Sequence, residues 1–398
     1  MRIICACHRL QTTLRNAADS FLQQYPSVAS VIIACKALVR FVMKSRPAST
    51  LLEKLQTEMN EPIRKLIQEA GTRWNSLLQL LESIVSCRKS ILSLLEMPTC
   101  PPKIKTLARH LVKDGIVDSL IKVLTPFRVA TKKFEAEKVP TVHMVVPTIK
   151  WLKGNLCSIR ESNNLGPIVT FVDHIMQNLD IQFQFTKQLS PVELMGFALD
   201  PTNMKRSETD SLRPLLESGF ALLEEYYRSN ETSLCFDAPS VPTTDPSTNL
   251  TTQVSSTEDG LLWEDDFLGD SMDIDSPSSS SIFAAEIALF RTEKINPTLK
   301  NGQELLDWWK NHASKYPVLT RIARRILAIP ASEAASERLF SIMKYLLFDQ
   351  RSTTDTSTVN KQGVIRAFLL QENARAADAK RALSRTTFTE ERINSASC

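Results

Sequence analysis

Residues 304–341 read ELLDWWKNHASKYPVLTRIARRILAIPASEAASERLFS, and this stretch decides the fold prediction. Its hydrophobic residues recur three and four positions apart, as they do along one face of an α-helix. Pro317 and Pro330 divide the stretch, because proline disfavours a helical residue before it and suits the first turn of the next helix. The pattern therefore predicts three consecutive helices.

Each of these predicted helices has a large apolar face that needs cover, either from the rest of the chain or from a second chain. The candidate dimer-interface residues on these faces are Trp308, Trp309, Tyr316, Leu319, Ile322, Leu339 and Phe340. The second helix also gathers a basic cluster on another side, made of Arg321, Arg324 and Arg325.

This stretch resembles the C-terminal dimerisation region of hAT-family transposases, a group that includes proteins with BED-type zinc fingers. Three more segments are similar to family blocks and follow in family order: CACHRLQ at 5–11, TRWNS at 72–76 and ALDPTNMK at 198–205. The resemblance implies the helical insertion domain and the C-terminal helices of a truncated RNase H-like domain. It also implies a nuclear protein that forms an intertwined homodimer or pairs with related hAT proteins.

The composition of the chain independently favours helices. Only 10 of the 398 residues are glycine, leucine is plentiful, and prolines separate the helical patterns. The best strand candidate, Val142 to Val146, is short and flanked by proline. The fold class is therefore predicted to be mainly α, with four parts: a helical insertion domain over 1–228, a linker over 229–282, the dimerisation region over 283–373 and a polar tail over 374–398.

The predicted linker is rich in Ser, Thr, Pro and Asp, a composition that cannot bury enough apolar surface to offset the entropy of ordering. Residues 229–290 contain twelve acidic and no basic residues, which leaves 48 basic against 32 acidic residues elsewhere, a net charge of +16. A basic body of this kind can bind polyanions such as DNA, or it can present ordinary solvated helix faces. Residues 261–267, LLWEDDF, could be a short recognition motif or plain linker.

The eight cysteines are scattered, which indicates free thiols in a reduced compartment. The apolar run at 28–35 is too short to span a bilayer, and no leader sequence is recognised, so no membrane association is expected. Cys5 and His8 have the spacing of half a zinc site, but no second pair lies at a suitable distance. We expect both to be helix-core residues and predict no metal site, and the BED finger of the family is absent from this sequence.

Glu337 is the candidate catalytic residue. By resemblance it matches the glutamate of the family's Asp-Asp-Glu set, whose carboxylates together hold two divalent ions for phosphoryl transfer. The two aspartates of the family precede the C-x-x-H block, so both would fall before residue 1. Mg²⁺ or Mn²⁺ would be expected only if a missing N-terminal part completed the set. The alternative is that Glu337 is a surface residue paired with Lys344 or Arg338.

Arg73 and Trp74 are the main DNA-binding candidates, because an exposed indole can stack on an unpaired base while an arginine holds a phosphate. In the family this pair is implied to lie near the active site. Equally, Trp74 could begin a helix and anchor the core. The basic cluster at 321–325 could contact phosphates without sequence preference, or face solvent.

Two classes of function compete at this stage. The first is a transposase-derived, domesticated dimerisation module that is nuclear, catalytically incomplete and in loose contact with DNA. The second is a fragment of an active metal-dependent DNA transposase. SUMO ligase activity, described for some BED-finger relatives, has no residue-level mechanism here. No small-molecule substrate is expected, since the sequence has no P-loop, nucleophile elbow or dinucleotide fingerprint.

Overall fold

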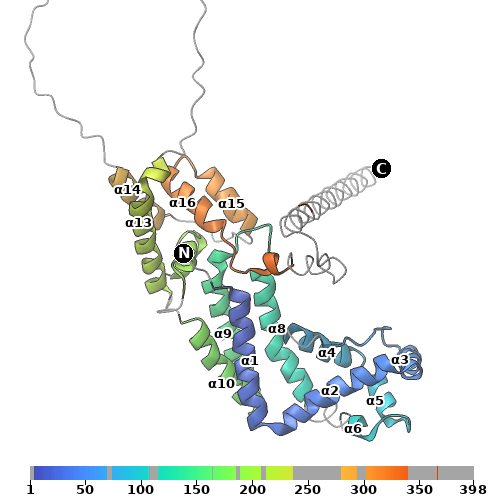
Figure 1. Ribbon diagram of the computed structural model, residues 1–398. Coiled ribbons are helices and arrows are strands. Elements are labelled where there is room, and N and C mark those ends of the chain that lie inside the picture. The colour runs from blue at the N-terminus through green and yellow to red at the C-terminus, as the bar shows by residue number, and fades with distance from the viewer. Residues whose placement is uncertain are drawn as a thin grey trace, which may run out of the picture. The chain divides into compact units, whose positions relative to one another are not determined.

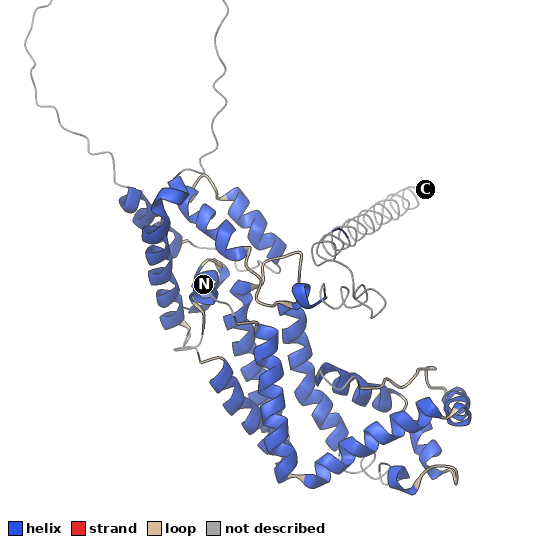
Figure 2. Ribbon diagram, viewed as in Figure 1, coloured by secondary structure: helices blue, strands red, loops and turns tan. Residues whose placement is uncertain are grey.

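The computed structural model describes residues 4–69, 74–105, 107, 115–163, 165–184, 189–207, 212–235, 279–293, 302–338 and 365. Every regular element in this part of the chain is helical, which confirms the prediction of a mainly α fold (Figures 1 and 2). The strand candidate at 142–146 instead forms the short 3₁₀ helix η1 (Val142–Met144) and the start of α9 (Val145–Ser162). The contacts divide the chain into two compact units, residues 1–190 with 330–398, and residues 191–329.

The first unit is built around a group of long helices. α1 packs along α10, while α8 contacts α1, α9 and α10, so that the four run alongside one another (Figure 1). The stacked rings of Phe21 and Phe171, with centroids 4.5 Å apart, join α1 to α10. Besides α9, the helices of this unit are α1 (Ala6–Gln24), α2 (Pro26–Lys44), α3 (Arg46–Glu58), α4 (Trp74–Ser86), α5 (Arg88–Glu96), α6 (Pro102–Lys105), α8 (Ile116–Phe134) and α10 (Gly166–Gln182).

The apolar segment of α2 is longer than the eight-residue run at 28–35 that the sequence showed. By length and composition alone this 19-residue helix, with a mean hydropathy of 1.7, could cross a membrane. Eight of its residues are nevertheless buried in the first unit, among them Cys35 and Leu38, and the helix packs near α1, α3, α4 and α6. Such burial is typical of the core helix of a folded domain.

The second unit contains α11 (Pro191–Ala198), α12 (Thr202–Ser207), α13 (Arg213–Cys235), α14 (Ser279–Arg291), α15 (Gly302–Asn311) and α16 (Pro317–Leu327). α15 and α16 are two of the three helices predicted within residues 304–341. The third begins at Ala334, belongs to the first unit and is described as far as Arg338.

The linker predicted over 229–282 is shortened by helix at both ends, since α13 continues to Cys235 and α14 begins at Ser279. Its interior, including the motif at 261–267, lies outside the described residues, as does the polar tail. α11 to α13 pack together with α14 to α16, although the sequence assigned these two sets of helices to different domains. The domain boundaries at 228 and 283 stay predictions.

A buried carboxylate joins two helices of the second unit. Glu286 of α14 accepts hydrogen bonds from the backbone N–H groups of Val318 at 3.0 Å and Leu319 at 2.7 Å. These are two of the N–H groups that have no partner inside α16, because they lie in its first turn. Glu286 therefore caps α16 although it precedes Val318 by more than thirty positions, and its negative charge lies at the positive end of the helix dipole.

We expect Glu286 to make the stability of the second unit depend on pH. Burial is the largest influence on the pKa of Glu286 and raises it, although the N–H groups of Leu319 and Val318 and the charge of Arg321 act in the opposite direction. A carboxyl group whose pKa is higher in the folded state stabilises the fold most below its unfolded pKa, about 4.3, and this contribution is lost as the pH rises through the folded value. The wild-type chain should therefore lose more stability between pH 4 and pH 7 than Glu286→Gln.

Urea unfolding at several pH values measures this difference. Glu217→Gln is a matched control, because Glu217 lies in the same unit but is exposed and pairs with Arg291 at 2.8 Å. If the curves of wild type and Glu286→Gln stay parallel across the range, the proposed titration of Glu286 is wrong.

Candidate functional site

The first family block and the SER-containing segment meet in the first unit. The backbone N–H of Ala6 donates to the carbonyl of Ala331 at 2.8 Å, and the N–H of Ala331 donates to the hydroxyl oxygen of Thr141 at 2.9 Å. The thiol of Cys5 lies 3.6 Å from the hydroxyl oxygen of Ser332. Residues more than three hundred positions apart are thus joined by hydrogen bonds, and the segment after Pro330 is anchored on the start of α1.

Glu337 lies one turn into the helix that begins at Ala334. Its backbone N–H donates to the carbonyl of Glu333 at 3.0 Å, and its side chain is exposed. Arg338, expected as a possible partner of Glu337, instead bonds Glu137 through Nε at 2.9 Å and Nη2 at 2.5 Å. Lys344, the other expected partner, lies outside the described residues.

The described residues around Glu337 do not form a two-metal centre. Two-metal phosphoryl transfer needs several carboxylates around a pair of divalent ions about 3.5–4 Å apart. Within the described residues no three His, Cys, Asp or Glu side chains are grouped so that they could hold a metal ion. Glu137, which approaches the same helix, is engaged by Arg338. We therefore derive no metal-dependent step from these residues.

The prediction that Cys5 and His8 are both helix-core residues is wrong for His8. α1 buries the face that carries Ala6, Arg9, Leu10 and Thr13, and this phase turns His8 outward to solvent. Cys5 is half-buried at the position that precedes the helix, where it contacts Ser332. His8 lies two positions from both Ala6 and Leu10, about 200° around the helix from each, so the apolar spacing of α1 itself turns His8 outward.

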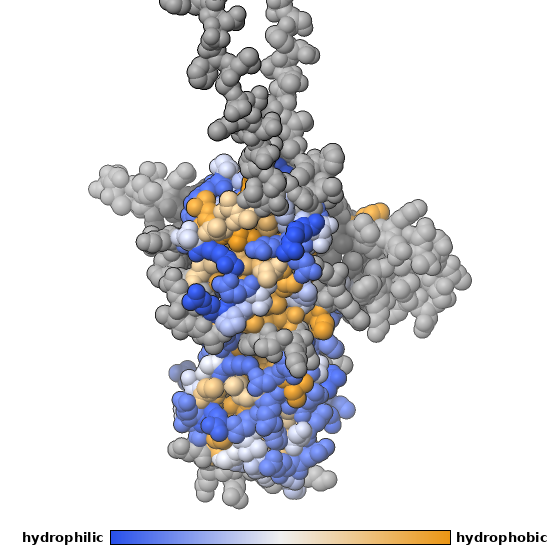
Figure 3. All heavy atoms as spheres, turned by 90° about the vertical axis from the view of Figure 1, so that its left-hand side faces the viewer, coloured by the Kyte–Doolittle hydropathy of each residue, from blue (hydrophilic) through white to orange (hydrophobic). Residues whose placement is uncertain are grey.

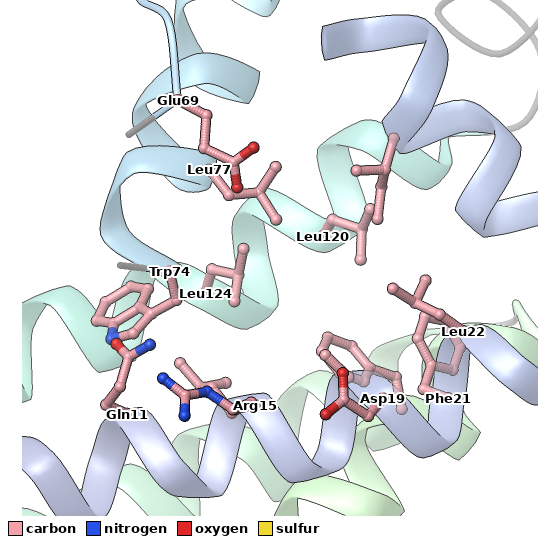
Figure 4. A pocket seen from close by; sticks show the side chains of 14 residues that line it. Gln11, Arg15, Asp19, Phe21, Leu22, Glu69, Trp74, Leu77, Leu120 and Leu124 are labelled. Carbon is pink, nitrogen blue, oxygen red and sulfur yellow. The ribbon is translucent and has the colours of Figure 1, made fainter. Parts of the chain in front are cut away.

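Trp74 is the first residue of α4 and lines a pocket of about 220 Å³ in the first unit. One edge of its indole packs against Phe127, with ring centroids 6.0 Å apart and an interplanar angle of 70°. In Figure 4 the ring lies on the same side of the pocket as Gln11 and Arg15 of α1. Half-buried Trp74 thus combines a packing contact with a place in a pocket wall, and both alternatives for its role stay open. Arg73 lies outside the described residues.

The predicted dimer face is largely internal to the second unit. Trp309, Tyr316, Leu319 and Ile322 are all buried, and Trp309 stacks on Phe290 of α14 with centroids 5.4 Å apart. The chain's own helices therefore cover this face. That these four side chains form a dimer interface stays a prediction, and it would require the second unit to open.

Three members of that predicted face differ from the rest. Trp308 is half-buried and stacks on His312, with ring centroids 4.0 Å apart, while Leu339 and Phe340 lie outside the described residues. Among the basic residues of α16, Arg324 is exposed and Arg321 and Arg325 are half-buried.

The ALDPTNMK block has a structural role that the sequence did not reveal. Asp200 accepts hydrogen bonds from the N–H of Thr202 at 2.9 Å and from its hydroxyl at 2.7 Å, which fixes the turn between α11 and α12. The indole N–H of Trp309 donates to the carbonyl of Leu199 at 3.1 Å, in the interior. The ALDPTNMK block and the stretch 304–341 therefore meet in the interior of the second unit. The Asp-x-Thr spacing of an Asx turn was the available signal for the turn.

Comparison with known proteins agrees with the resemblance seen in the sequence. Residues 285–369 match the hAT family C-terminal dimerisation region. The chain is 25% identical over 356 residues to an AC transposase of Zea mays. This alignment covers 85% of this chain and 40% of the transposase. It is 29% identical over 145 residues to the zinc finger BED domain-containing protein DAYSLEEPER of Arabidopsis thaliana, covering 36% of this chain and 20% of that protein.

A human relative extends the same pattern. Zinc finger BED domain-containing protein 6 of Homo sapiens is 22% identical over 352 residues, which is 85% of this chain and 34% of that protein. The chain thus spans two fifths or less of the length of these relatives. Residues 285–369 thus match the hAT family C-terminal dimerisation region, and the chain is similar to hAT transposases and BED zinc finger proteins along most of its length.

Proposed function

We propose that this protein is a transposase-derived dimerisation module that pairs with a second copy of itself or with a related hAT chain. The observation that carries the proposal is the match of residues 285–369 to the family's dimerisation region. Because the tryptophan face predicted from the sequence is buried, we assign the pairing surface to the outer side of α14.

The outer side of α14 is apolar and faces away from its own unit. Phe283, Ile287 and Phe290 point inward, whereas Ile282 is 42% exposed and Leu289 is 45% exposed. Ala284, Ala285 and Ala288 are also exposed on this helix, and small residues allow a second helix to approach closely. Figure 3 views the molecule from the side on which α13 and α14 lie in Figure 1, and hydrophobic side chains gather on the surface of this unit.

Charge placed on this side of α14 should prevent dimer formation. We expect the wild-type chain to be a dimer by light scattering at micromolar concentration. Ile282→Glu combined with Leu289→Glu should weaken the dimer at least about 10-fold, since burying an unpaired carboxylate is costly. Ile181→Glu is the matched control, because Ile181 is 51% exposed on α10 of the first unit, and this variant should remain dimeric. A wild-type monomer, or a double variant that stays dimeric, contradicts the assignment.

We further propose that these 398 residues do not cut DNA by themselves. The support is the exposed position of Glu337, the engagement of Glu137 by Arg338, and the finding that no three His, Cys, Asp or Glu side chains among the described residues are grouped so that they could hold a metal ion. The alternative function, part of an active Asp-Asp-Glu DNA transposase, is favoured by the similarity to a maize AC transposase over 85% of this chain.

A cleavage assay separates these two functions. The chain and its Glu337→Gln variant are incubated with terminal-repeat DNA and either Mg²⁺ or Mn²⁺, and nicked products are counted. We expect no nicking above background from either protein. Metal-dependent nicking that disappears in Glu337→Gln would establish the transposase alternative and overturn the non-cutting proposal.

The same proposal includes a nuclear location and loose contact with DNA phosphates through the basic side of α16. Arg324 is exposed there, next to the half-buried Arg321 and Arg325. Binding of this kind weakens steeply with salt and shows no sequence preference. Trp74, with Arg15 beside it in the pocket, is the second candidate contact, for an unpaired base.

A further inference from the structure

The pocket beside Trp74 is formed by α1, α4, α8 and α10 of the first unit, together with Ile32 of α2 and Glu69 (Figure 4). Pockets for drug-sized ligands measure roughly 300–1,000 Å³, so a volume of about 220 Å³ fits a ligand of one or two fused rings. Half-buried Trp74 offers such a ring an aromatic surface. The buried apolar side chains of the lining are Leu14, Phe21, Leu120, Leu124 and Phe171.

Two charged side chains of α1, Arg15 and Asp19, also line the pocket. They are four positions apart and so share one side of the helix. Lys54 and Glu58 have the same spacing in α3 and form an ion pair at 3.7 Å, whereas Arg15 and Asp19 do not pair, and neither has a partner among the described residues. Figure 4 shows the guanidinium of Arg15 on the side of Trp74 and the carboxylate of Asp19 on the opposite side. The pocket therefore has one end that donates hydrogen bonds and another that accepts them.

The charges around the pocket cancel. The third charged side chain in its lining, Glu69, is paired with Lys36 of α2 at 2.7 Å. Arg15 and Asp19 contribute one charge of each sign. A neutral ligand can therefore satisfy both ends of the pocket, whereas an ion would face a like charge at one of them.

We propose that this pocket binds a guanine base and that Arg15 and Asp19 determine its specificity. Guanine is neutral and planar, and its adjacent O6 and N7 atoms accept two hydrogen bonds in the arrangement that arginine contacts most often. On the neighbouring edge its N1–H and N2–H groups point in parallel, so the two oxygens of the Asp19 carboxylate can accept both. Trp74 and the apolar walls then pack against the ring.

The other common bases fit the two ends less well. Adenine carries an amino group in place of O6, which would set a donor against the donors of Arg15. Cytosine and thymine have no N7 and cannot offer Arg15 the same pair of acceptors. Hypoxanthine, the base of inosine, keeps O6, N7 and N1–H and lacks only the amino group at C2. A comparison of inosine with guanosine therefore isolates the second hydrogen bond to Asp19.

This inference rests on the proposal that Trp74 contacts an unpaired base, and it adds which base is bound and by which side chains. Arg15 and Asp19 are both exposed, so the pocket is open to solvent beside them and a sugar attached to the base can remain outside. The guanine can belong to a single strand of nucleic acid or to a free nucleoside. The two parts of the experiment below distinguish these sources.

Binding of free nucleosides to the 398-residue chain tests the pocket by itself. Guanosine, inosine, adenosine and cytidine are titrated, and saturation-transfer NMR gives a dissociation constant for each. We expect guanosine to bind at least about 10-fold more tightly than adenosine or cytidine, with inosine between them, because a bidentate contact discriminates against the wrong base by about this factor. Equal affinities for guanosine and adenosine would overturn the proposal.

Two variants identify the residues that select the base. Asp19→Asn and Arg15→Gln should each weaken guanosine binding at least about 10-fold and change adenosine binding less than about 2-fold. Both side chains are exposed, so neither substitution should disturb the fold. Asp173→Asn is the matched control, because Asp173 of α10 is bonded by Arg160 at 2.7 Å and does not line the pocket. An Asp19→Asn variant that keeps the preference for guanosine contradicts the assignment.

The second part of the experiment uses short thymidine oligonucleotides with a single central dG, deoxyinosine or dA, and fluorescence anisotropy at low salt. A preference for the dG strand that disappears in Asp19→Asn assigns the pocket to an unpaired guanine in a strand. Guanosine binding without that preference assigns it to a free nucleoside. Strands that bind equally well while guanosine does not bind overturn the guanine pocket and leave the loose DNA contact. Guanosine binding without any strand binding overturns the DNA contact and leaves the pocket.

Discussion

Trp309→Ala is expected to lower the free energy of unfolding of the second unit by about 3–5 kcal/mol, the usual cost of removing a buried aromatic side chain. Trp309 is only 4% exposed and stacks on Phe290. Its indole N–H also satisfies the buried carbonyl of Leu199, which the substitution would leave without that donor. Hydrogen exchange of peptides from α13 and α16 measures the loss in this unit alone, which matters because a chain of two units does not unfold in one step.

Trp308→Ala is the control for this prediction, since the two indoles are neighbours in sequence and differ in burial. Trp308 is half-buried and stacks on His312. We expect its removal to cost about 2 kcal/mol or less, because part of its surface already contacts water. Equal losses for the two variants would show that the interior position of Trp309 is not what stabilises the unit.

Gly219→Ala should destabilise the contact between α11 and α13 by about 1–3 kcal/mol, a typical cost of overpacking. A Cβ atom at Gly219 would lie 2.5 Å from the carbonyl oxygen of Leu194 and 2.8 Å from the Cβ of Ala198. One of these is a backbone atom and the other is fixed to the backbone, so neither can move aside without shifting a helix. Hydrogen exchange of the backbone amides in α11 and α13 should become faster in this variant.

Gly154→Ala is the matched control, because a Cβ at Gly154 in α9 would meet no atom within 4 Å. Alanine is favoured over glycine inside a helix by up to about 1 kcal/mol, so this variant should be slightly more stable than wild type. A Gly219→Ala variant as stable as Gly154→Ala would mean that the two helices are not held as closely as the structure indicates.

The helices themselves could be predicted from the sequence. Pro317 and Pro330 mark boundaries that the structure keeps, and the apolar spacing identified Trp309, Leu319 and Ile322 as residues that need cover. These features are local, because a proline ring and a three-to-four repeat act within one or two turns. The prediction for His8 was wrong because it followed the Cys-His spacing and not the apolar stripe of α1, which leaves His8 on the opposite face.

The sequence alone determined the helical class of this protein, the family resemblance of its blocks and which residues would avoid water. Only the tertiary structure decided what covers them: α14 and the ALDPTNMK turn cover Trp309, and the thiol of Cys5 meets the segment around Ser332. The physical reason is that helix propensity and periodicity depend on neighbours in the chain. Burial and hydrogen bonding also depend on partners that are far apart in the chain, as Trp309 and Leu199 are at 110 positions and Cys5 and Ser332 at 327, and no local pattern identifies such partners.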